Sequence, residues 1–379
     1  MGSNIDRKIL KSIAAGLLFL SFFALPFAKS AYGSYSFIDI HPAGWVESHA
    51  VCVNAWGEVA GYGLTASGER GFLWSRGGIT EILPPGASGA RAFWVNGQGD
   101  VAGTAVIGGR SRAFLYRGGA YLDPTPGWAF SEARHVGEDG TVSGTGEFGA
   151  YVYRNGVVEL LPGFSVAVGA NAAGQILGSA ENTAKLFLPG KGYMNIRPPG
   201  ADFAVPRGIN ESGLVAVSSV EADSEKGFVY SGGFYVFMTP PGWSSSNAMA
   251  INNNSQVVGY GDSPAGRRSF LRTGAAYEEI SFPGWTATEA VSVNDIGQVS
   301  GSGETAAGET HAFVASSESV PITTGGGTAG AAGGGGCGMV TGRSGAPFSA
   351  ASALSLLLIF SPLLALGLRS RLKRPASHG

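Results

Sequence analysis

Short apolar runs alternate with polar turns along most of the chain. One unit recurs: an apolar strand, a turn of the type Asn-x-x-Gly and a second strand ending in glycine, as in Val53-Asn54-Ala55-Trp56-Gly57 followed by Val59-Ala60-Gly61. The first turn position falls at residues 54, 96, 137, 171, 210, 252 and 294. A spacing near 40 residues, with several short strands in each unit, is typical of propeller blades.

Each unit contains four strand-like segments. The first, strand a, carries alanine four residues before the turn in every unit except the one with Pro206, which fits the crowding of innermost strands around an axis. Strand b follows the turn, strand c is aromatic as in Phe72-Leu73-Trp74, and a glycine-containing turn leads to strand d. This pattern predicts four antiparallel strands per blade.

The two ends of the repeat region favour a closed ring. The seventh unit has no fourth strand, whereas residues 35–40 near the N-terminus have the pattern of the other d strands. If this segment pairs beside Phe313, the strands close into a ring without unpaired ends. We therefore predict an all-β fold for residues 34–317: a seven-bladed β-propeller closed by the N-terminal strand in the last blade.

Residues 1–33 have the pattern of a signal peptide. Arg7, Lys8 and Lys11 precede an apolar run at residues 13–27, and small residues follow it. An uncleaved N-terminal anchor is the alternative. Under either interpretation the repeat region is exported, to the cell surface or to the periplasmic or extracellular face of a membrane.

The C-terminal end predicts a membrane anchor. Residues 318–347 are a Gly-rich linker that contains Cys337-Gly338, and residues 348–374 combine an uncharged apolar run with a basic tail. The run of residues 348–368 is long enough for a single transmembrane helix, and the basic tail stays on the cytoplasmic side. The membrane is thus an expected partner, and the repeat region faces outward.

This tail resembles the three-part C-terminal sorting signals of bacterial surface proteins. In those signals a Gly-rich stretch with Cys-Gly precedes an apolar span and a basic end. The resemblance implies cleavage by an intramembrane sorting protease near Cys337 and Gly338, and a plain single-pass anchor is the alternative. The other cysteine, Cys52, lies in an apolar strand, so we expect it to be a buried free thiol with no disulfide.

The repeats resemble the extracellular HAF-type repeat family. The residues that carry the likeness are His311-Ala312-Phe313, Ile251-Asn252 and Val257-Val258-Gly259. The resemblance implies an exported β-repeat protein and little about activity. Most units lack the His-Ala-Phe opening and have variants such as Arg112-Ala113-Phe114.

Composition excludes some classes of function. The formal net charge is −2 and no basic stripe is interleaved with aromatic residues, so nucleic acid is not an expected partner. Five histidines occur in the whole chain and none shows the spacing of metal ligands, so we expect neither a metal nor a cofactor.

Candidate ligand-binding residues fall into two sets on one expected face, where the b-to-c and d-to-a connections should be long and variable. The first set consists of aromatic residues that follow Pro-Gly: Trp45, Trp128, Trp243 and Trp285. Such rings can stack on sugars or seal neighbouring blades. The second set departs from the apolar pattern of strand a: His49, Arg91, Glu132, Arg134, His135, Arg207, Asn247 and Glu289.

No set of residues amounts to an active site. The one inner carboxylate pair, Glu132 and Glu289, falls in well-separated units, whereas a glycosidase needs two carboxyl groups about 5–10 Å apart. We therefore expect a non-enzymatic, surface-anchored module that binds a glycan or a protein. The alternatives are an exported hydrolase or lyase acting on polysaccharide, and a passive coat or spacer protein.

Overall fold

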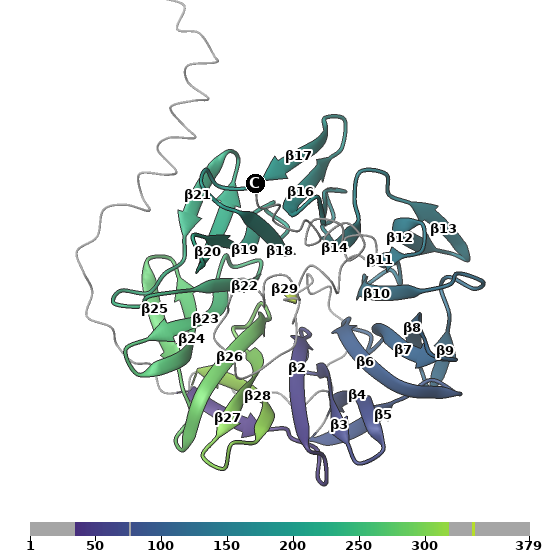
Figure 1. The fold of residues 1–379 in the computed structure, drawn as a ribbon, viewed down its shortest axis with the longest axis horizontal. Coiled ribbons are helices and arrows are strands. Elements are labelled where there is room, and N and C mark those ends of the chain that lie inside the picture. The colour runs from purple at the N-terminus through teal and green to yellow at the C-terminus, as the bar shows by residue number, and fades with distance from the viewer. Residues whose placement is uncertain (1–34, 76, 318–335, 338–379) are drawn as a thin grey trace, which may run out of the picture.

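The computed structural model describes residues 35–75, 77–317 and 336–337, which form seven four-stranded antiparallel blades around a central axis (Figure 1). The prediction of an all-β, seven-bladed propeller is confirmed. The expected signal peptide (1–33), most of the linker, Gly338 and the expected transmembrane helix and tail (348–374) lie outside the described residues. In the part of the chain that is described, no helix has the length and apolar character needed to cross a membrane.

The strands of each blade run in chain order from the axis outward. Blade 1 contains β2 (Glu47–Val53), β3 (Val59–Thr65), β4 (Gly68–Ser75) and β5 (Gly78–Ile82), and blade 2 contains β6 (Ala87–Val95), β7 (Val101–Ile107), β8 (Arg110–Arg117) and β9 (Ala120–Leu122). Blade 3 contains β10 (Ser131–Val136), β11 (Val142–Gly146), β12 (Gly149–Arg154) and β13 (Val157–Leu160), and blade 4 contains β14 (Val166–Ala170), β15 (Ile176–Ala180), β16 (Thr183–Leu188) and β17 (Gly192–Ile196). Blade 5 contains β18 (Phe203–Ile209), β19 (Val215–Glu221), β20 (Ser224–Ser231) and β21 (Phe234–Phe237), and blade 6 contains β22 (Asn247–Ile251), β23 (Val257–Ser263), β24 (Gly266–Thr273) and β25 (Ala276–Ile280).

Blade 7 joins the two ends of the ring. It contains β26 (Trp285–Val293), β27 (Val299–Thr305) and β28 (Thr310–Ser317), and its outermost strand is β1 (Tyr35–Asp39). Tyr35 pairs with Ser317 and Asp39 pairs with Phe313, in antiparallel register. The predicted closure by the N-terminal strand is therefore confirmed.

Small residues allow the inner strands to pack closely. Ala50 on β2 is fully buried and pairs with Gly61 on β3. A Cβ atom at Gly61 would lie 2.2 Å from the carbonyl oxygen of His49 and 2.4 Å from the ring of Phe72. The aromatic residue of strand c therefore covers the glycine of strand b, which explains why blades 1, 2, 3, 6 and 7 combine these two residue types.

Every innermost strand contains a β-bulge at the same place, between the fourth and the second residue before the turn. The extra residue is Val51, Phe93, Arg134, Val168, Arg207, Met249 or Val291. Bulges re-aim side chains and bend strands. Neighbouring bulged residues meet across blade boundaries, because Arg134 lies over the ring of Phe93 and Met249 packs with Val291.

Asparagine side chains connect the blades at the a-to-b turns. The Oδ1 atom of Asn54 accepts hydrogen bonds from the backbone of Trp56 and Glu58, and its Nδ2 atom donates to the carbonyl of Asn96 in the next blade, at 2.8 Å. Within the described residues this bond between blades recurs from Asn96, Asn171, Asn210, Asn252 and Asn294. Gly137 has no side chain to donate it. We call these six residues the Asn ring.

The b-to-c connections correct one expectation from the sequence. Two residues join strands b and c in blades 1 to 6, so these connections are tight hairpins rather than long loops. Ala222 and Asp223 form one of them with φ values of 47° and 65°, the left-handed conformation that such short turns require. Only the d-to-a connections vary widely, from residues 83–86 in one blade to residues 238–246 in another.

A short segment beyond the ring returns to its axis. β29 (Gly336–Cys337) pairs antiparallel with the axis-facing edge of β26, where Ser292 pairs with Cys337 and Val293 with Gly336 (Figure 1). Cys52 is disulfide-bonded, so the expectation of a free buried thiol was wrong. Composition alone does not fix where a Gly-rich linker runs, which is why the sequence did not reveal this bond.

Candidate functional site

Five of the candidate residues lie at one level of the inner strands. His49, Arg91, Glu132, Asn247 and Glu289 each stand five residues before the turn and pair with the equivalent residue of strand b. Val166 and Val205 hold this place in blades 4 and 5. We call this level the channel mouth. It lies at the opposite end of the inner strands from the Asn ring.

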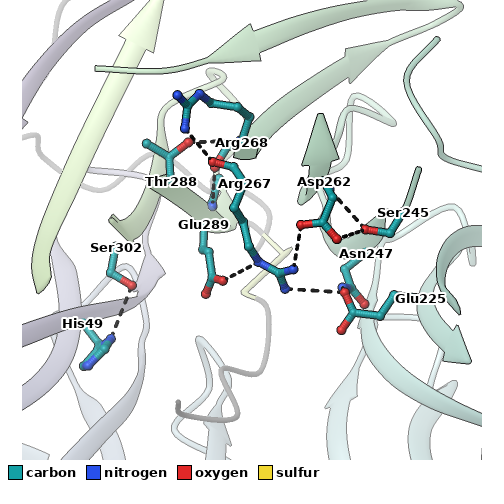
Figure 2. A network of polar contacts seen from close by, with 12 residues as sticks. His49, Glu225, Ser245, Asn247, Asp262, Arg267, Arg268, Thr288, Glu289 and Ser302 are labelled. Atoms are coloured by element: carbon teal, nitrogen blue, oxygen red, sulfur yellow. Dashed lines mark hydrogen bonds and ion pairs between the residues drawn. The ribbon is translucent and has the colours of Figure 1, made fainter. Parts of the chain in front are cut away.

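Arg267 connects three blades at the mouth (Figure 2). It is the second residue of strand c of blade 6, and its Nε atom donates to Glu289 of blade 7 at 2.7 Å. Its Nη1 atom donates to Asp262 at 3.2 Å, and its Nη2 atom donates to Glu225 of blade 5 at 3.4 Å. The guanidinium group also lies over the ring of Tyr260, 4.8 Å from the centroid. One cation is thus held by three carboxylates.

Burial governs the protonation of this network. Burial raises the pKa of Glu225, which is 6% exposed, although Arg267 and the hydrogen bond from Asn247 act in the opposite direction. Burial alone would lower the pKa of Arg267, but Tyr260, Glu289 and Glu225 raise it above its usual value. The arginine therefore stays charged, and the carboxylates around it hold its side chain in one orientation.

A second cluster lies across the mouth in blades 1 and 2. The Nη2 atom of Arg91 lies 2.7 Å from Oε1 of Glu69, and its guanidinium group covers the ring of Tyr62 at 4.7 Å. The ring of His49 stacks on the ring of Tyr62, with 5.2 Å between their centroids. The Nδ1 atom of His49 lies 3.3 Å from the hydroxyl oxygen of Ser302. Burial lowers the pKa of His49, so the imidazole is neutral at pH 7.

The hydroxyl of Tyr62 is the unusual atom of this cluster. It is buried and has no hydrogen-bond partner, and burial raises the pKa of Tyr62 to about 12. The phenol is therefore protonated and carries a donor that nothing in the described residues accepts. A buried polar group without a partner costs about 1–3 kcal/mol, and a ligand that accepts this hydrogen bond would recover that cost.

The remaining candidates of strand a lie deeper. Arg134 and Arg207 occupy bulges, where Arg134 forms an ion pair with Glu132 and the Nε atom of Arg207 donates to Ser218 at 3.1 Å. Burial lowers the pKa of Arg207. His135 packs edge-on against Trp94, 4.3 Å between centroids, and burial lowers its pKa to about 4. These three residues form the wall below the mouth.

The four candidate tryptophans are half-buried; Trp45, Trp128 and Trp243 lie in the connections that lead to strand a, and Trp285 is the first residue of β26. Trp45 packs edge-on against Phe72 at 5.9 Å, and Trp128, Trp243 and Trp285 pack in the same way on Tyr151, Phe270 and Phe313 at 5.4, 5.9 and 6.0 Å. Each ring therefore contacts strand c of its own blade. Their role in ligand binding stays a prediction.

Sequence reasoning missed the residues that organise the mouth from strand c. Glu69, Glu225 and Arg267 each lie three residues before the aromatic residue of that strand. A charged residue repeated at that place was the available signal. The structure does not bring Glu132 and Glu289 into one pair, because Glu132 has Arg134 as its partner and Glu289 has Arg267. The described residues contain no group of three or more His, Cys, Asp or Glu placed to hold a metal ion.

No protein-family model matches the chain, and no curated protein matches it. Among solved structures, a virginiamycin B lyase from Staphylococcus aureus is 15% identical, with a TM-score of 0.48, over 74% of this chain and 99% of that chain. The protein YCF48 bound to a D1 peptide is 12% identical, with a TM-score of 0.48, over 77% and 98% of the two chains. The extracellular domain of a hybrid two-component system from B. thetaiotaomicron is 11% identical, with a TM-score of 0.47, over 74% and 40%.

Proposed function

We propose that this propeller is an exported, surface-anchored binding module without catalytic activity, whose glycan or protein ligand docks at the channel mouth. Export and anchoring rest on the sequence patterns of residues 1–33 and 348–374. The likeness of the repeats to the HAF-type family supports the same location. Tail processing near Cys337 belongs to this proposal as well.

The contrast between the two ends of the inner strands carries the proposal. At the Asn ring, the same side chain makes the same bond in blade after blade, which is a structural role. At the mouth, five blades present polar groups of four different types and two blades present valine, and ion pairs such as Arg91–Glu69 and Arg267–Glu289 hold several of the polar groups in place. Variation within a repeat, combined with fixed orientation, is what a preorganised binding site requires.

The chemistry of the mouth suits a polar ligand that both donates and accepts hydrogen bonds. Arginine forks and carboxylates bind vicinal sugar hydroxyls or a peptide backbone equally well. The half-buried tryptophans in or directly after the d-to-a connections lie on the same side of the ring as the mouth and would supply contact area at its rim. A glycan uses both features at once, so it is the ligand class we place first.

A screen of the purified protein against glycans and surface proteins tests this function. We expect Arg267→Gln to weaken binding at least tenfold, because the three carboxylates around Arg267 lose the cation that holds them in position. Arg154→Gln is the matched control, since Arg154 forms an exposed ion pair with Asp139 near the Asn ring, at 3.8 Å. Loss of binding in both variants, or in neither, would contradict the proposed site.

Two substitutions in this protein distinguish a binding module from a hydrolase or lyase. Glu132→Gln and Glu289→Gln would abolish turnover of a polysaccharide if these carboxylates were catalytic. For a binding module we expect no turnover by the unmodified protein, and a graded loss of affinity in the two variants.

A further inference from the structure

A side-chain hydroxyl joins neighbouring blades at four places within the described residues. It lies on strand a and accepts a hydrogen bond from a backbone N–H of strand c in the preceding blade; the residues that carry it are Ser48, Ser131, Ser246 and Thr288. The same hydroxyl bonds to a residue that precedes strand a. In three of these joints the partner does not titrate, because it is the hydroxyl of Thr125, the hydroxyl of Thr239 or the carbonyl of Ile280. Between blades 7 and 1 the partner is the imidazole of His41, 2.9 Å from Ser48.

The hydrogen bonds around His41 suit a neutral ring. The carbonyl oxygen of Trp45 only accepts, so the Nε2 atom of His41, 3.2 Å away, carries a proton. The Nδ1 atom then accepts from the hydroxyl of Ser48, whose oxygen in turn accepts from the N–H of Ala312 at 2.9 Å. Ser48 is fully buried. A proton added to Nδ1 would leave the Ser48 hydroxyl without its acceptor, and a buried donor without an acceptor is unfavourable.

A second histidine, His311 on strand c of blade 7, stacks on this ring. The centroids of the two imidazoles are 3.9 Å apart, and their planes differ by 8°. Both nitrogens of His311 face carboxylates, since Nδ1 lies 2.7 Å from Asp39 and Nε2 lies 3.6 Å from Glu309. The nitrogens of His41 face the uncharged groups described above instead. A charge on His311 is therefore compensated where it stands, whereas a charge on His41 adds a second cation in contact with the first.

The other joints show that one cation is usual at this place. The residue before the N–H donor of strand c is a permanent cation in three of them, namely Arg112, Lys226 and Arg268. Arg112 forms an ion pair with Asp123, as His311 does with Asp39. In those joints the partner of the hydroxyl is uncharged. Among the joints that have the hydroxyl bond, only the one between blades 7 and 1 gains a second charge in acid.

This joint is also where the ring closes. β1 is joined to the rest of blade 7 by noncovalent contacts alone, because the chain runs from β1 through His41 to β2 of blade 1. The pairing of β1 with β28 ends at Asp39, and the N–H of Ile40 adds one more bond, to the carbonyl of Ala312 at 2.9 Å. His41 is the next residue along the chain. A change at His41 therefore acts on the end of the closing strand.

We propose that the stacked pair of His41 and His311 is an acid-sensitive latch, which holds β1 against β28 at neutral pH and releases it when both rings are charged. Release opens the pairing from its Asp39 end and leaves β28 as the outer edge of blade 7, with unpaired backbone groups. Acid thus loosens the ring at one joint while the other blades stay paired. This inference does not depend on a ligand at the channel mouth.

The direction of the effect follows from the protonation of His41. Burial lowers the pKa of His41 below its ordinary value of 6.5, and His311 lowers it further, although the carbonyl of Trp45 and the carboxylates of Asp39 and Glu309 act in the opposite direction. The open latch exposes His41 to solvent, so the open form binds the proton more tightly than the closed form does. The latch is therefore most stable above pH 6.5 and weakens as the pH falls below that value.

Hydrogen exchange of the full-length protein at pH 7 and pH 5 tests the latch. Each amide exchange rate is divided by the rate of an unstructured chain at the same pH, which gives a protection factor. We expect the amides that pair β1 with β28 to lose about tenfold in protection at pH 5, the factor that corresponds to one pKa unit. The pairing of β20 with β21 in blade 5, where Lys226 and Thr239 hold the equivalent places, should keep its protection. An equal loss in the two pairings, or no loss at β1, would overturn the proposal.

Two substitutions of His41 assign the effect to the latch. His41→Thr gives this joint the residue type of Thr239, so β1 should keep its protection at pH 7 and no longer respond to acid. If His41→Thr does not fold, His41→Gln serves, because an amide accepts from Ser48 and donates to Trp45 at any pH. His135→Gln is the matched control, since it removes a histidine from blade 3, and β1 should still respond to acid. An acid response at β1 that persists without His41, or that disappears with His135→Gln, rejects the latch.

Discussion

The Nδ2 atom of Asn294 donates a hydrogen bond to the carbonyl oxygen of Asn54 at 2.9 Å, across 240 residues of sequence. This bond closes the Asn ring between blades 7 and 1. It lies in a buried position, and both residues also hold their own turns through Oδ1. Ring closure therefore combines the strand pairing between β1 and β28 with side-chain bonds between blades 7 and 1, which also include the bond from the backbone N–H of Val53 to Oγ of Ser292 at 3.0 Å.

We expect Asn294→Ala to lower the free energy of unfolding by about 2–3 kcal/mol, because it leaves the Asn54 carbonyl and the N–H of Gln298 without their partners. Urea denaturation checks this value. Asn155→Ala is a useful contrast, since Asn155 lies in an exposed c-to-d turn with φ 51° and contributes only to that turn. A loss for Asn294→Ala that does not exceed the loss for Asn155→Ala would show that the bond between blades contributes little.

The joint between blades 3 and 4 lacks this bond and offers a site for stabilisation. Gly137 stands at the place of the asparagine, and the adjoining core contains only Ala150, Phe164 and Ala167 among its buried residues. Oδ1 of Asp139 accepts from the N–H of Thr141 and so replaces part of the missing side chain. A Cβ atom at Gly137 would lie 2.9 Å from that oxygen.

We therefore expect the double variant Gly137→Asn, Asp139→Ala to gain about 1 kcal/mol of stability, because the new amide completes the ring while the clash is removed. The single variant Gly137→Asn should gain less. Thermal unfolding of both variants measures the change in stability. A double variant that is less stable than the original protein would mean that an asparagine at residue 137 cannot form the bond between blades that the Asn ring makes elsewhere.

The glycine of strand b gives a prediction of the opposite sign. We expect Gly61→Ala to destabilise the protein by about 3 kcal/mol or more, because the new methyl group would lie 2.2 Å from a backbone carbonyl that cannot move away. Gly78→Ala is the control, since its φ is not positive and its Cβ atom would have no neighbour closer than 3.7 Å. Equal stability of the two variants, measured by urea denaturation, would mean that strand c does not pack over strand b as described.

The sequence was sufficient to predict the ring because each blade repeats one local pattern. The turns at Asn54 and Asn294, and the strand at Tyr35, show both the number of blades and the way in which they close. The repeat pattern also contained a signal for the channel mouth, because Glu225 and Arg267 lie 42 residues apart at equivalent places in neighbouring blades. That relationship is visible only after strand c is aligned between units.

Other features depend on contacts that no local pattern encodes. The disulfide of Cys52 and the pairing of β29 follow a linker whose composition allows many paths. The hairpin at Ala222 was missed because alanine is not a usual residue of a tight turn, although it has a positive φ there. In both cases tertiary packing selected a conformation that sequence propensity leaves open.

Acid should destabilise the ring through His135. Burial lowers the pKa of His135 from 6.5 to about 4, so the folded protein binds this proton less well than the unfolded chain does. The stabilising effect is complete above pH 6.5, is lost as the pH falls, and has disappeared at about pH 4. We expect a loss of about 2 kcal/mol between pH 7 and pH 5 from this residue.

Urea denaturation of the original protein and of His135→Gln at both pH values measures the contribution of His135 to the pH dependence of stability. The variant should lose about 2 kcal/mol less stability than the original protein over the same interval. The pKa of His41 and that of His49 are also lowered by burial, so part of the acid sensitivity persists in the variant. An identical pH dependence in both proteins would assign the whole effect to other groups.

The hydroxyl of Tyr62 links stability to binding in a way that one substitution reveals. Because this hydroxyl is buried without a partner, Tyr62→Phe should leave stability unchanged or raise it by up to about 1 kcal/mol. If the ligand accepts a hydrogen bond from this atom, the same variant should lose about tenfold in affinity. Ser143→Ala removes another buried hydroxyl without a partner, which pairs with His135 below the mouth and not at its level, and this variant should not change affinity. The measurement is a titration of the original protein and the two variants with a glycan found in the screen. If Tyr62→Phe binds the glycan as tightly as the original protein does, the ligand does not contact blades 1 and 2, and the site lies nearer Arg267.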